Sequence, residues 1–138
     1  MNWLIDTNVA SELRKVAPHP RVLAWAERQP PFTTYLSAAA VFELERGVRR
    51  KERSDPVQGA RLRRWLDHLL EVEYADRILA IDQEIAIIAA GLHAPDPRPE
   101  YDAWIAATAL HHNLTVVTRN AKDFVPLGVR VLDPWTAG

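Results

Sequence analysis

The feature of this sequence that most constrains its fold is an apolar run that ends abruptly in a carboxylate. Residues 3–5 are apolar, and Asp6, Thr7 and Asn8 follow them at once. This order is typical of a buried strand with an acid at its C-terminal end, the edge where parallel α/β sheets bind ligands. The alternative is that one of the three polar residues caps the next helix. For Asp6 alone capping is the better interpretation, so a functional role depends on companion residues.

Apolar or β-branched stretches alternate with helix-forming stretches along the rest of the chain. Strands are predicted at 32–36, 78–81 (buried), 114–118 and 129–132, and helices at 9–15, 21–29, 38–46 and beyond, 56–70, 83–92 and 102–110. Ser37, Asp55 and Asp82 stand directly before three of these helices, where N-cap residues are expected. The alternation predicts an α/β fold over 1–138, a single domain whose helices cover a central, mainly parallel sheet.

The composition excludes several kinds of site. Apolar residues make up 48% of the chain and charged residues 25%, which is typical of an ordinary folded domain. There are no cysteines, so disulfides, thiolate metal sites and cysteine nucleophiles are excluded. No stretch approaches the about 20 apolar residues of a membrane span, and no secretory signal is evident, so we expect a cytoplasmic protein without membrane contact.

Basic side chains gather in one segment of the chain. Residues 46–64 hold eight of the 17 Lys and Arg side chains and two acids, a net charge of +6 in a chain whose total is −1. Such a segment can contact phosphates or an acidic partner protein. The alternative is a solvated helical face, and charge alone slightly favours that alternative.

Four acids occupy positions from which they can meet. Asp6 and Asp123 follow predicted strands, and Asp102 lies in the first turn of an alanine-rich apolar helix. Glu43 projects from a helix face of mostly small residues, which leaves room for an ion. Right-handed crossovers bring the C-terminal ends of all strands to one edge of the sheet. Carboxylates that share a small volume need a cation between them, and oxygen ligands suit Mg²⁺ or Mn²⁺.

A hard divalent ion in such a site activates water and stabilises charge on a phosphodiester. The predicted chemistry is therefore hydrolysis of a nucleic-acid backbone. A phospho-accepting receiver domain also groups acids at strand ends, but it needs adjacent acids near the first strand and a late lysine, and neither is present.

Four segments of the chain resemble, in order, the motifs of the PIN-domain family, with the closest similarity to VapC-type toxins of bacterial toxin–antitoxin pairs. They are Leu-Ile-Asp-Thr-Asn-Val (4–9), Leu-Ser-Ala (36–38) with Phe-Glu-Leu-Glu-Arg-Gly-Val (42–48), Asp-Ala-Trp-Ile-Ala-Ala-Thr-Ala (102–109) and Val-Thr-Arg-Asn-Ala-Lys-Asp-Phe (117–124). The resemblance implies a three-layer α/β/α fold and a Mg²⁺- or Mn²⁺-dependent endoribonuclease. Asp6, Glu43 and Asp102 match the acidic triad of the family, with Asp6 and Asp102 expected to hold the ion and Glu43 to bind it or orient water.

The chain departs from the family pattern at one position. Many relatives carry an acid directly after the Thr-Arg pair, where this chain has Asn120, with Asp123 three residues later. Either Asp123 completes the metal site or Asn120 contributes a neutral oxygen, and we favour Asp123. Hydrogen-bonding support for the carboxylates is expected from Thr7, Asn8, Ser37, Thr118 and Asn120.

The resemblance also implies partners. RNA is the expected substrate, and its backbone is expected to contact Arg46, Arg49, Arg50, Arg119 and Lys122. A small antitoxin protein is expected to occupy the cleft, within a homodimer or a toxin–antitoxin hetero-oligomer. The alternative function is an interaction module that keeps the fold but has weakened catalysis, which the Asn120 departure leaves open.

Overall fold

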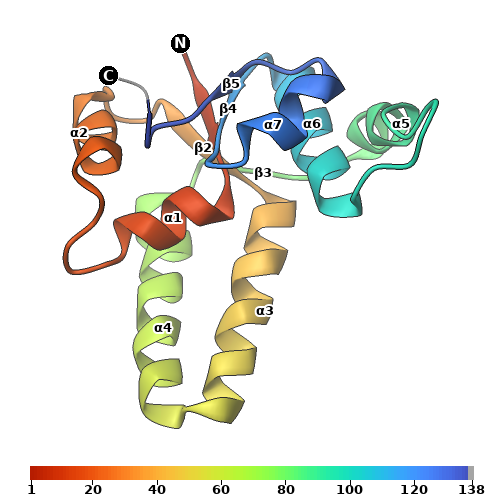
Figure 1. Ribbon diagram of the computed structural model, residues 1–138. Coiled ribbons are helices and arrows are strands. Elements are labelled where there is room, and N and C mark those ends of the chain that lie inside the picture. Colours follow the sequence, from red (N-terminus) through yellow and green to blue (C-terminus); the bar gives the residue numbers. More distant parts are fainter. Residues whose placement is uncertain (137–138) are drawn as a thin grey trace.

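The computed structural model describes residues 1–136, so the last two residues of the predicted domain lie outside the described part (Figure 1). Five strands form one sheet: β1 (Trp3–Ile5), β2 (Thr34–Ser37), β3 (Ile78–Leu79), β4 (Thr115–Val117) and β5 (Val131–Leu132). The helices are α1 (Thr7–Leu13), α2 (Pro20–Arg28), α3 (Ala38–Ser54), α4 (Pro56–His68), α5 (Gln83–Gly91), α6 (Glu100–His112) and α7 (Ala121–Phe124), with single turns η1 (Leu69–Glu73) and η2 (Val125–Leu127).

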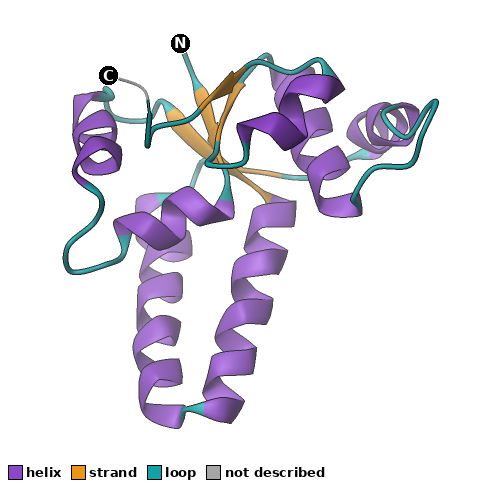
Figure 2. Ribbon diagram, viewed as in Figure 1, coloured by secondary structure: helices purple, strands orange, loops and turns teal. Residues whose placement is uncertain are grey.

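The sheet is parallel throughout, with the strand order β3-β2-β1-β4-β5. Figure 2 shows α1 and α2 on one side of it and α5, α6 and α7 on the other. The predicted α/β fold with helices on both faces of a parallel sheet is therefore confirmed. Because both faces are covered, the central strands β1 and β4 are buried along their whole length. Trp3 of β1 packs edge-on against Trp25 of α2, with ring centroids 5.3 Å apart.

The sheet reverses its winding direction between β1 and β4. The chain runs from β1 outward to β2 and β3, then crosses back to place β4 on the other side of β1. In open parallel sheets such a reversal leaves a crevice beyond the C-terminal ends of the two strands, where ligands bind. Asp6 follows β1 there, and its backbone N–H donates to the carbonyl oxygen of Val117 at 3.0 Å. The fold thus places Asp6 at the crevice.

Side-chain caps explain where the helices begin. Ser37 accepts a hydrogen bond from the N–H of Ala39 at 3.0 Å, Asp55 from Gln58 at 3.2 Å and Asp82 from Ile85 at 2.9 Å, so all three predicted N-caps are confirmed. Asp6 caps as well, because its carboxylate accepts from the N–H of Thr7. For this reason the first helix begins at Thr7 and not at the predicted Val9, and it ends at Leu13.

Two strand predictions need correction. The predicted buried strand at 78–81 is only two residues long, and both of them are half-buried. The reason is its position, since β3 is the edge of the sheet and pairs with β2 alone. The opposite edge, β5, is likewise shorter than the predicted 129–132 and half-buried.

Helices α3 and α4 lie side by side and project from the sheet as a helical arm, residues 38–68 (Figure 1). Arg63 of α4 donates to Glu45 of α3 through both terminal nitrogens, at 2.7 and 2.8 Å, and to Glu52 at 3.2 Å. Arg49 also donates to Glu45, at 2.6 Å. Hydrogen bonds from Arg63 and then Arg49 lower the pKa of Glu45 to about 2. Part of the basic segment at 46–64 is therefore used to join the two helices.

Candidate active site

Asp6 is the most firmly held acid in the crevice. Its Oδ1 accepts hydrogen bonds from the backbone N–H of Thr7 at 2.7 Å and from the Tyr101 hydroxyl at 2.6 Å. Its Oδ2 accepts from the Thr118 hydroxyl at 2.7 Å and from the Asn8 amide at 3.4 Å. Only 3% of Asp6 is exposed. A buried carboxylate needs such donors to remain in place, so these contacts fix the position of its oxygens.

A second layer of hydrogen bonds connects the ends of β1 and β4. The Asn8 amide donates to the Thr118 hydroxyl at 3.2 Å, and its carbonyl oxygen accepts from the N–H of Arg119 at 3.2 Å. The Thr118 hydroxyl also accepts from the N–H of Asn120 at 3.0 Å. Thr7, Asn8 and Thr118 therefore contact Asp6 as the sequence predicts. These bonds hold the loop after β4 against the start of α1.

Ser37 and Asn120 do not contact the acids. The Ser37 hydroxyl is fully buried and caps α3, with no hydrogen bond to a carboxylate in the described part of the chain. The side chain of Asn120 makes no hydrogen bond to any residue from 1 to 136; its backbone N–H donates to the Thr118 hydroxyl and its carbonyl oxygen accepts from the N–H of Asp123. The expected support for the acids thus comes from the ends of β1 and β4 and not from the end of β2.

The negative charges of Asp123 and Asp6 both act on Asp102, and we call these three residues the acid cluster. Burial raises the pKa of Asp102 to about 6, and the negative charges of Asp123 and then Asp6 add to the effect. Asp102 makes no hydrogen bond or ion pair with any residue in the range 1–136. The fold thus assembles three carboxylates from β1, α6 and α7 whose mutual repulsion is not relieved by a basic side chain.

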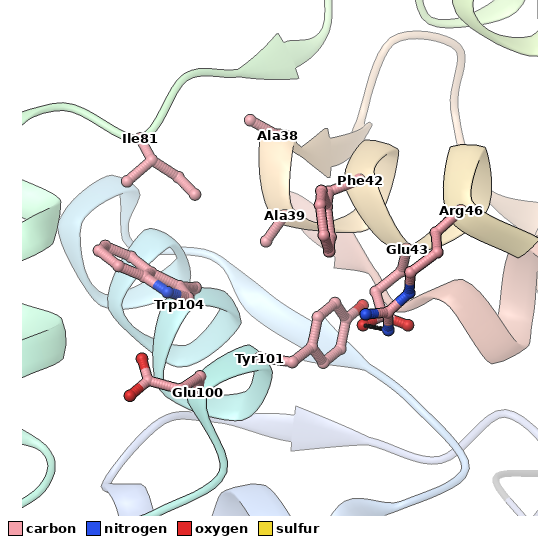
Figure 3. Close-up of a pocket in the computed structure, with 9 residues that line it drawn as sticks. All are labelled: Ala38, Ala39, Phe42, Glu43, Arg46, Ile81, Glu100, Tyr101 and Trp104. Carbon is pink, nitrogen blue, oxygen red and sulfur yellow. Dashed lines mark hydrogen bonds and ion pairs between the residues drawn. The ribbon is translucent and has the colours of Figure 1, made fainter.

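Glu43 lies beside the acid cluster, but its carboxylate is directed elsewhere. Arg46 donates to Glu43 at 2.7 Å, and Figure 3 shows Tyr101 of α6 pointing toward this pair. Glu43 and Tyr101 both line a cavity of about 400 Å³. Glu43 and Thr7 both line a second cavity of about 250 Å³. The structure therefore brings Glu43 next to the neighbours of Asp6, while its role as a metal ligand stays a prediction.

The acid cluster offers carboxylate oxygens, the donors that a hard divalent cation prefers. Within residues 1–136 no group of three or more His, Cys, Asp or Glu side chains is arranged so that it could hold a metal ion. Burial raises the pKa of Asp102, and the charges of Asp123 and Asp6 add to the effect; a bound cation would relieve the repulsion among these charges. The donors are carboxylate oxygens, which Mg²⁺ and Mn²⁺ prefer. Asp6, Asp102 and Asp123 are accordingly the residues that would hold the ion.

The expected RNA contacts surround this site on two sides. Arg119 and Lys122 are exposed beyond the end of β4, and the Arg119 guanidinium lies 5.1 Å from the centroid of the Trp135 ring. Arg46, Arg49 and Arg50 are exposed on α3. Their contacts with RNA stay predictions, and none of the five is buried.

Tyr101 is a site residue that the sequence reasoning missed. Burial, and then the charge of Asp6, raise the pKa of its hydroxyl well above the ordinary value of 10.0. The hydroxyl therefore stays protonated and donates to Asp6 at any pH near neutrality. The available clue was its place directly before Asp102 at the start of a helix, but its partner Asp6 is 95 residues away in sequence.

We expect Tyr101→Phe to weaken Mn²⁺ binding by about 10- to 100-fold, the usual cost of losing a hydrogen bond to a metal-binding carboxylate. The phenyl ring keeps the packing, so the fold should be retained. Calorimetric titration of the metal-free protein with Mn²⁺ measures the change. Tyr35→Phe is the matched control, because the Tyr35 hydroxyl has no hydrogen bond within the described residues. Equal affinities for both variants would contradict the positioning role of Tyr101.

No helix within residues 1–136 is both long and apolar enough to span a membrane.

Comparison with known proteins identifies the family. A family model described as PIN domain matches residues 3–125. The chain is 37% identical over 140 aligned positions to "Toxin FitB" of Neisseria gonorrhoeae, covering 96% of this chain and 97% of that protein. It is 34% identical to "VapC ribonuclease Y4jK" of Sinorhizobium fredii, covering 96% of each. The structure of FitAB bound to an IR36 DNA fragment superposes with a TM-score of 0.83 at 31% identity, covering 99% of this chain and 97% of that one. The chain therefore belongs to the PIN-domain family.

Proposed function

We propose that this protein is a divalent-metal-dependent endoribonuclease that acts as the toxin of a toxin–antitoxin pair. One observation carries the proposal: at the end of β1 and the start of α6, burial raises the pKa of Asp102 to about 6, and the negative charges of Asp123 and Asp6 add to the effect. Relatives of nearly the same length are named as a toxin and as a ribonuclease. The combination supports hydrolysis of RNA phosphodiester bonds.

Each acid has a distinct task in the proposed reaction. Asp6, held by five donors, and Asp102, which has none in the described chain, bind the cation at the end of β1 and the start of α6. When bound, Mg²⁺ or Mn²⁺ supplies an activated water and neutralises charge on the scissile phosphate. Glu43 orients the attacking water from α3. Asp123 completes the ligand set in place of Asn120, since its charge acts on Asp102 more strongly than the charge of Asp6 does.

Basic residues on both sides of the acids hold the RNA. Arg119 and Lys122 lie after β4, and Arg46, Arg49 and Arg50 lie on α3. Contacts of this kind bind the phosphate backbone and carry little base selectivity. We therefore propose that the shape of the RNA, and access to an unpaired stretch of it, decide where the chain is cut.

An antitoxin is the proposed protein partner. Solved structures that share this fold include FitAB bound to DNA and a toxin–antitoxin complex from Klebsiella pneumoniae. We propose that this chain likewise binds a cognate antitoxin in a hetero-oligomer, and that it forms a homodimer. Within that complex the acid cluster is the natural target for a basic side chain of the inhibitor, because its charge is not compensated by the chain itself.

Removal and return of the metal test the proposed activity. Cleavage of a single-stranded RNA should stop in excess EDTA and return with Mg²⁺ or Mn²⁺, because the donor set consists of carboxylates. The measurement is the rate of fragment formation on a denaturing gel. Asp102→Asn, treated identically, controls for contaminating nucleases and should remain inactive with metal. Metal binding by the parent without any cleavage would support the alternative, an interaction module with weakened catalysis.

A further inference from the structure

Two hollows on α3 share a wall made by Phe42 and Arg46. The first, of about 400 Å³, is also lined by Glu43 and Tyr101 and so adjoins the acid cluster (Figure 3). The second, of about 640 Å³, continues along the helical arm beside Arg49, Arg50 and Arg53. Phe42 and Arg46 therefore stand at the point where a path along the arm meets the candidate active site.

Phe42 is a large apolar side chain that lies outside the hydrophobic core. It is 61% exposed, whereas Ala40 and Leu44 on the opposite face of α3 are buried. The guanidinium of Arg46 lies 5.1 Å from the centroid of the Phe42 ring. An aromatic ring beside a guanidinium offers flat surfaces on which a nucleobase stacks.

The arginines next to Phe42 form one continuous face of the helix. Positions 46, 49, 50 and 53, which we call the arginine stripe, follow the i, i+3, i+4, i+7 spacing, and Phe42 extends it by one turn. Arg46 pairs with Glu43 and Arg49 with Glu45, but Arg50 and Arg53 have no ion-pair partner in the part of the chain that the structure describes. From Phe42 to Arg53 the face extends for about 16 Å.

We propose that Phe42 and the arginine stripe bind single-stranded RNA next to the scissile phosphate, with one base stacked on Phe42 and the backbone along Arg50 and Arg53. This inference rests on the proposed function and adds the substrate class and a residue that positions it. Stacking on Phe42 requires a base with a free face, which a duplex does not offer.

The test measures binding separately from cleavage. A fluorescein-labelled oligoadenylate of twelve nucleotides is titrated with the protein in EDTA, where no cleavage is expected, and binding is followed by anisotropy. Phe42→Ala should weaken binding by about tenfold, the usual loss of one base–aromatic stack, and Phe42→Trp should restore it. Arg50→Gln and Arg53→Gln should each reduce the slope of log K against the logarithm of the salt concentration by about 0.7. The same RNA in a duplex should bind more weakly to the parent and respond little to Phe42→Ala.

Phe32→Ala is the matched control. Phe32 is 75% exposed and lies beside Arg77, with its ring centroid 5.5 Å from that guanidinium, but it precedes β2 and so lies at the end of the sheet opposite the C-terminal strand ends. Its removal should leave RNA affinity unchanged. The proposal is overturned if Phe42→Ala binds single strands like the parent, or if it only dissociates a dimer or an antitoxin complex. RNA binding that depends on Phe42 without any cleavage when metal is added would refute the proposed nuclease and leave this inference standing.

Discussion

Asp102→Asn is expected to lower RNA cleavage by about 10³-fold and at the same time to stabilise the metal-free protein above pH 6. The loss of activity follows because a metal ion contributes several kcal/mol to the stabilisation of a phosphoryl transition state, and about 4 kcal/mol corresponds to about 10³-fold in rate. The gain in stability follows because Asp102 is a half-buried acid without a hydrogen-bonding partner in the described chain, near two other negative charges.

The pH dependence of this stabilisation has a definite sign. The pKa of Asp102 is raised from its ordinary value of 3.8 to about 6 in the folded protein, so the folded state binds its proton more tightly than the unfolded state does. Stability is therefore full below about pH 4 and is lost as the pH rises through 6. Allowing for solvent screening of a partly exposed group, the loss is about 1 kcal/mol at pH 7.5. Urea unfolding in EDTA at pH 4 and pH 7.5 should show a benefit from the Asp102→Asn substitution only at the higher pH.

Asp6→Asn is the informative companion to this variant. It should also lose cleavage, but it should destabilise the protein, because the Asp6 carboxylate accepts five hydrogen bonds and an amide would turn a donor toward the donors around it. If both variants lose activity but only Asp6→Asn is less stable, then Asp6 is a carboxylate stabilised by hydrogen bonds and Asp102 is one destabilised by burial and neighbouring negative charge. Cleavage that survives Asp102→Asn, or a loss of stability at pH 7.5, would contradict the assignment.

The parts of this site that local sequence predicts are those fixed by strand ends. Asp6 directly follows a buried apolar run, and the direction of parallel strands and crossovers carries Asp123 to the same edge. Asp102 was predictable because an acid at the start of a nearly all-apolar helix is out of place without a partner. The same rules predicted the parallel sheet and the three N-caps.

The parts that escaped prediction depend on contacts between distant segments. The Tyr101 hydroxyl donates to an acid 95 positions earlier, and no local pattern encodes such a pair. The Glu43 carboxylate pairs with Arg46 on the same helix. The spacing of residues along the helix does not determine which rotamer Glu43 adopts. The short β3 follows from its place at the edge of the sheet, which becomes known only once the strand order is known.

A second large effect on stability is expected in the helical arm, at a glycine where α3 and α4 are in contact. A Cβ added at Gly59 would lie 2.4 Å from the Cα of Glu52, a backbone atom that can move only if the two helices separate. Separation also lengthens the hydrogen bonds from Arg63 to Glu45 and Glu52. Gly59→Ala is therefore expected to reduce the free energy of unfolding by about 3 kcal/mol, the upper part of the range for overpacked sites.

A second glycine on the arm gives a control of opposite sign. Gly47 lies in the middle of α3, and a Cβ added there meets no atom within 4 Å. Gly47→Ala should therefore stabilise the protein by about 0.5–1 kcal/mol through helix propensity alone. Urea denaturation of the two variants beside the parent measures both effects. If the two substitutions shift the midpoint in the same direction, the close approach of α3 and α4 at Gly59 is wrong, and the helical arm is not the rigid support that the arginine stripe requires.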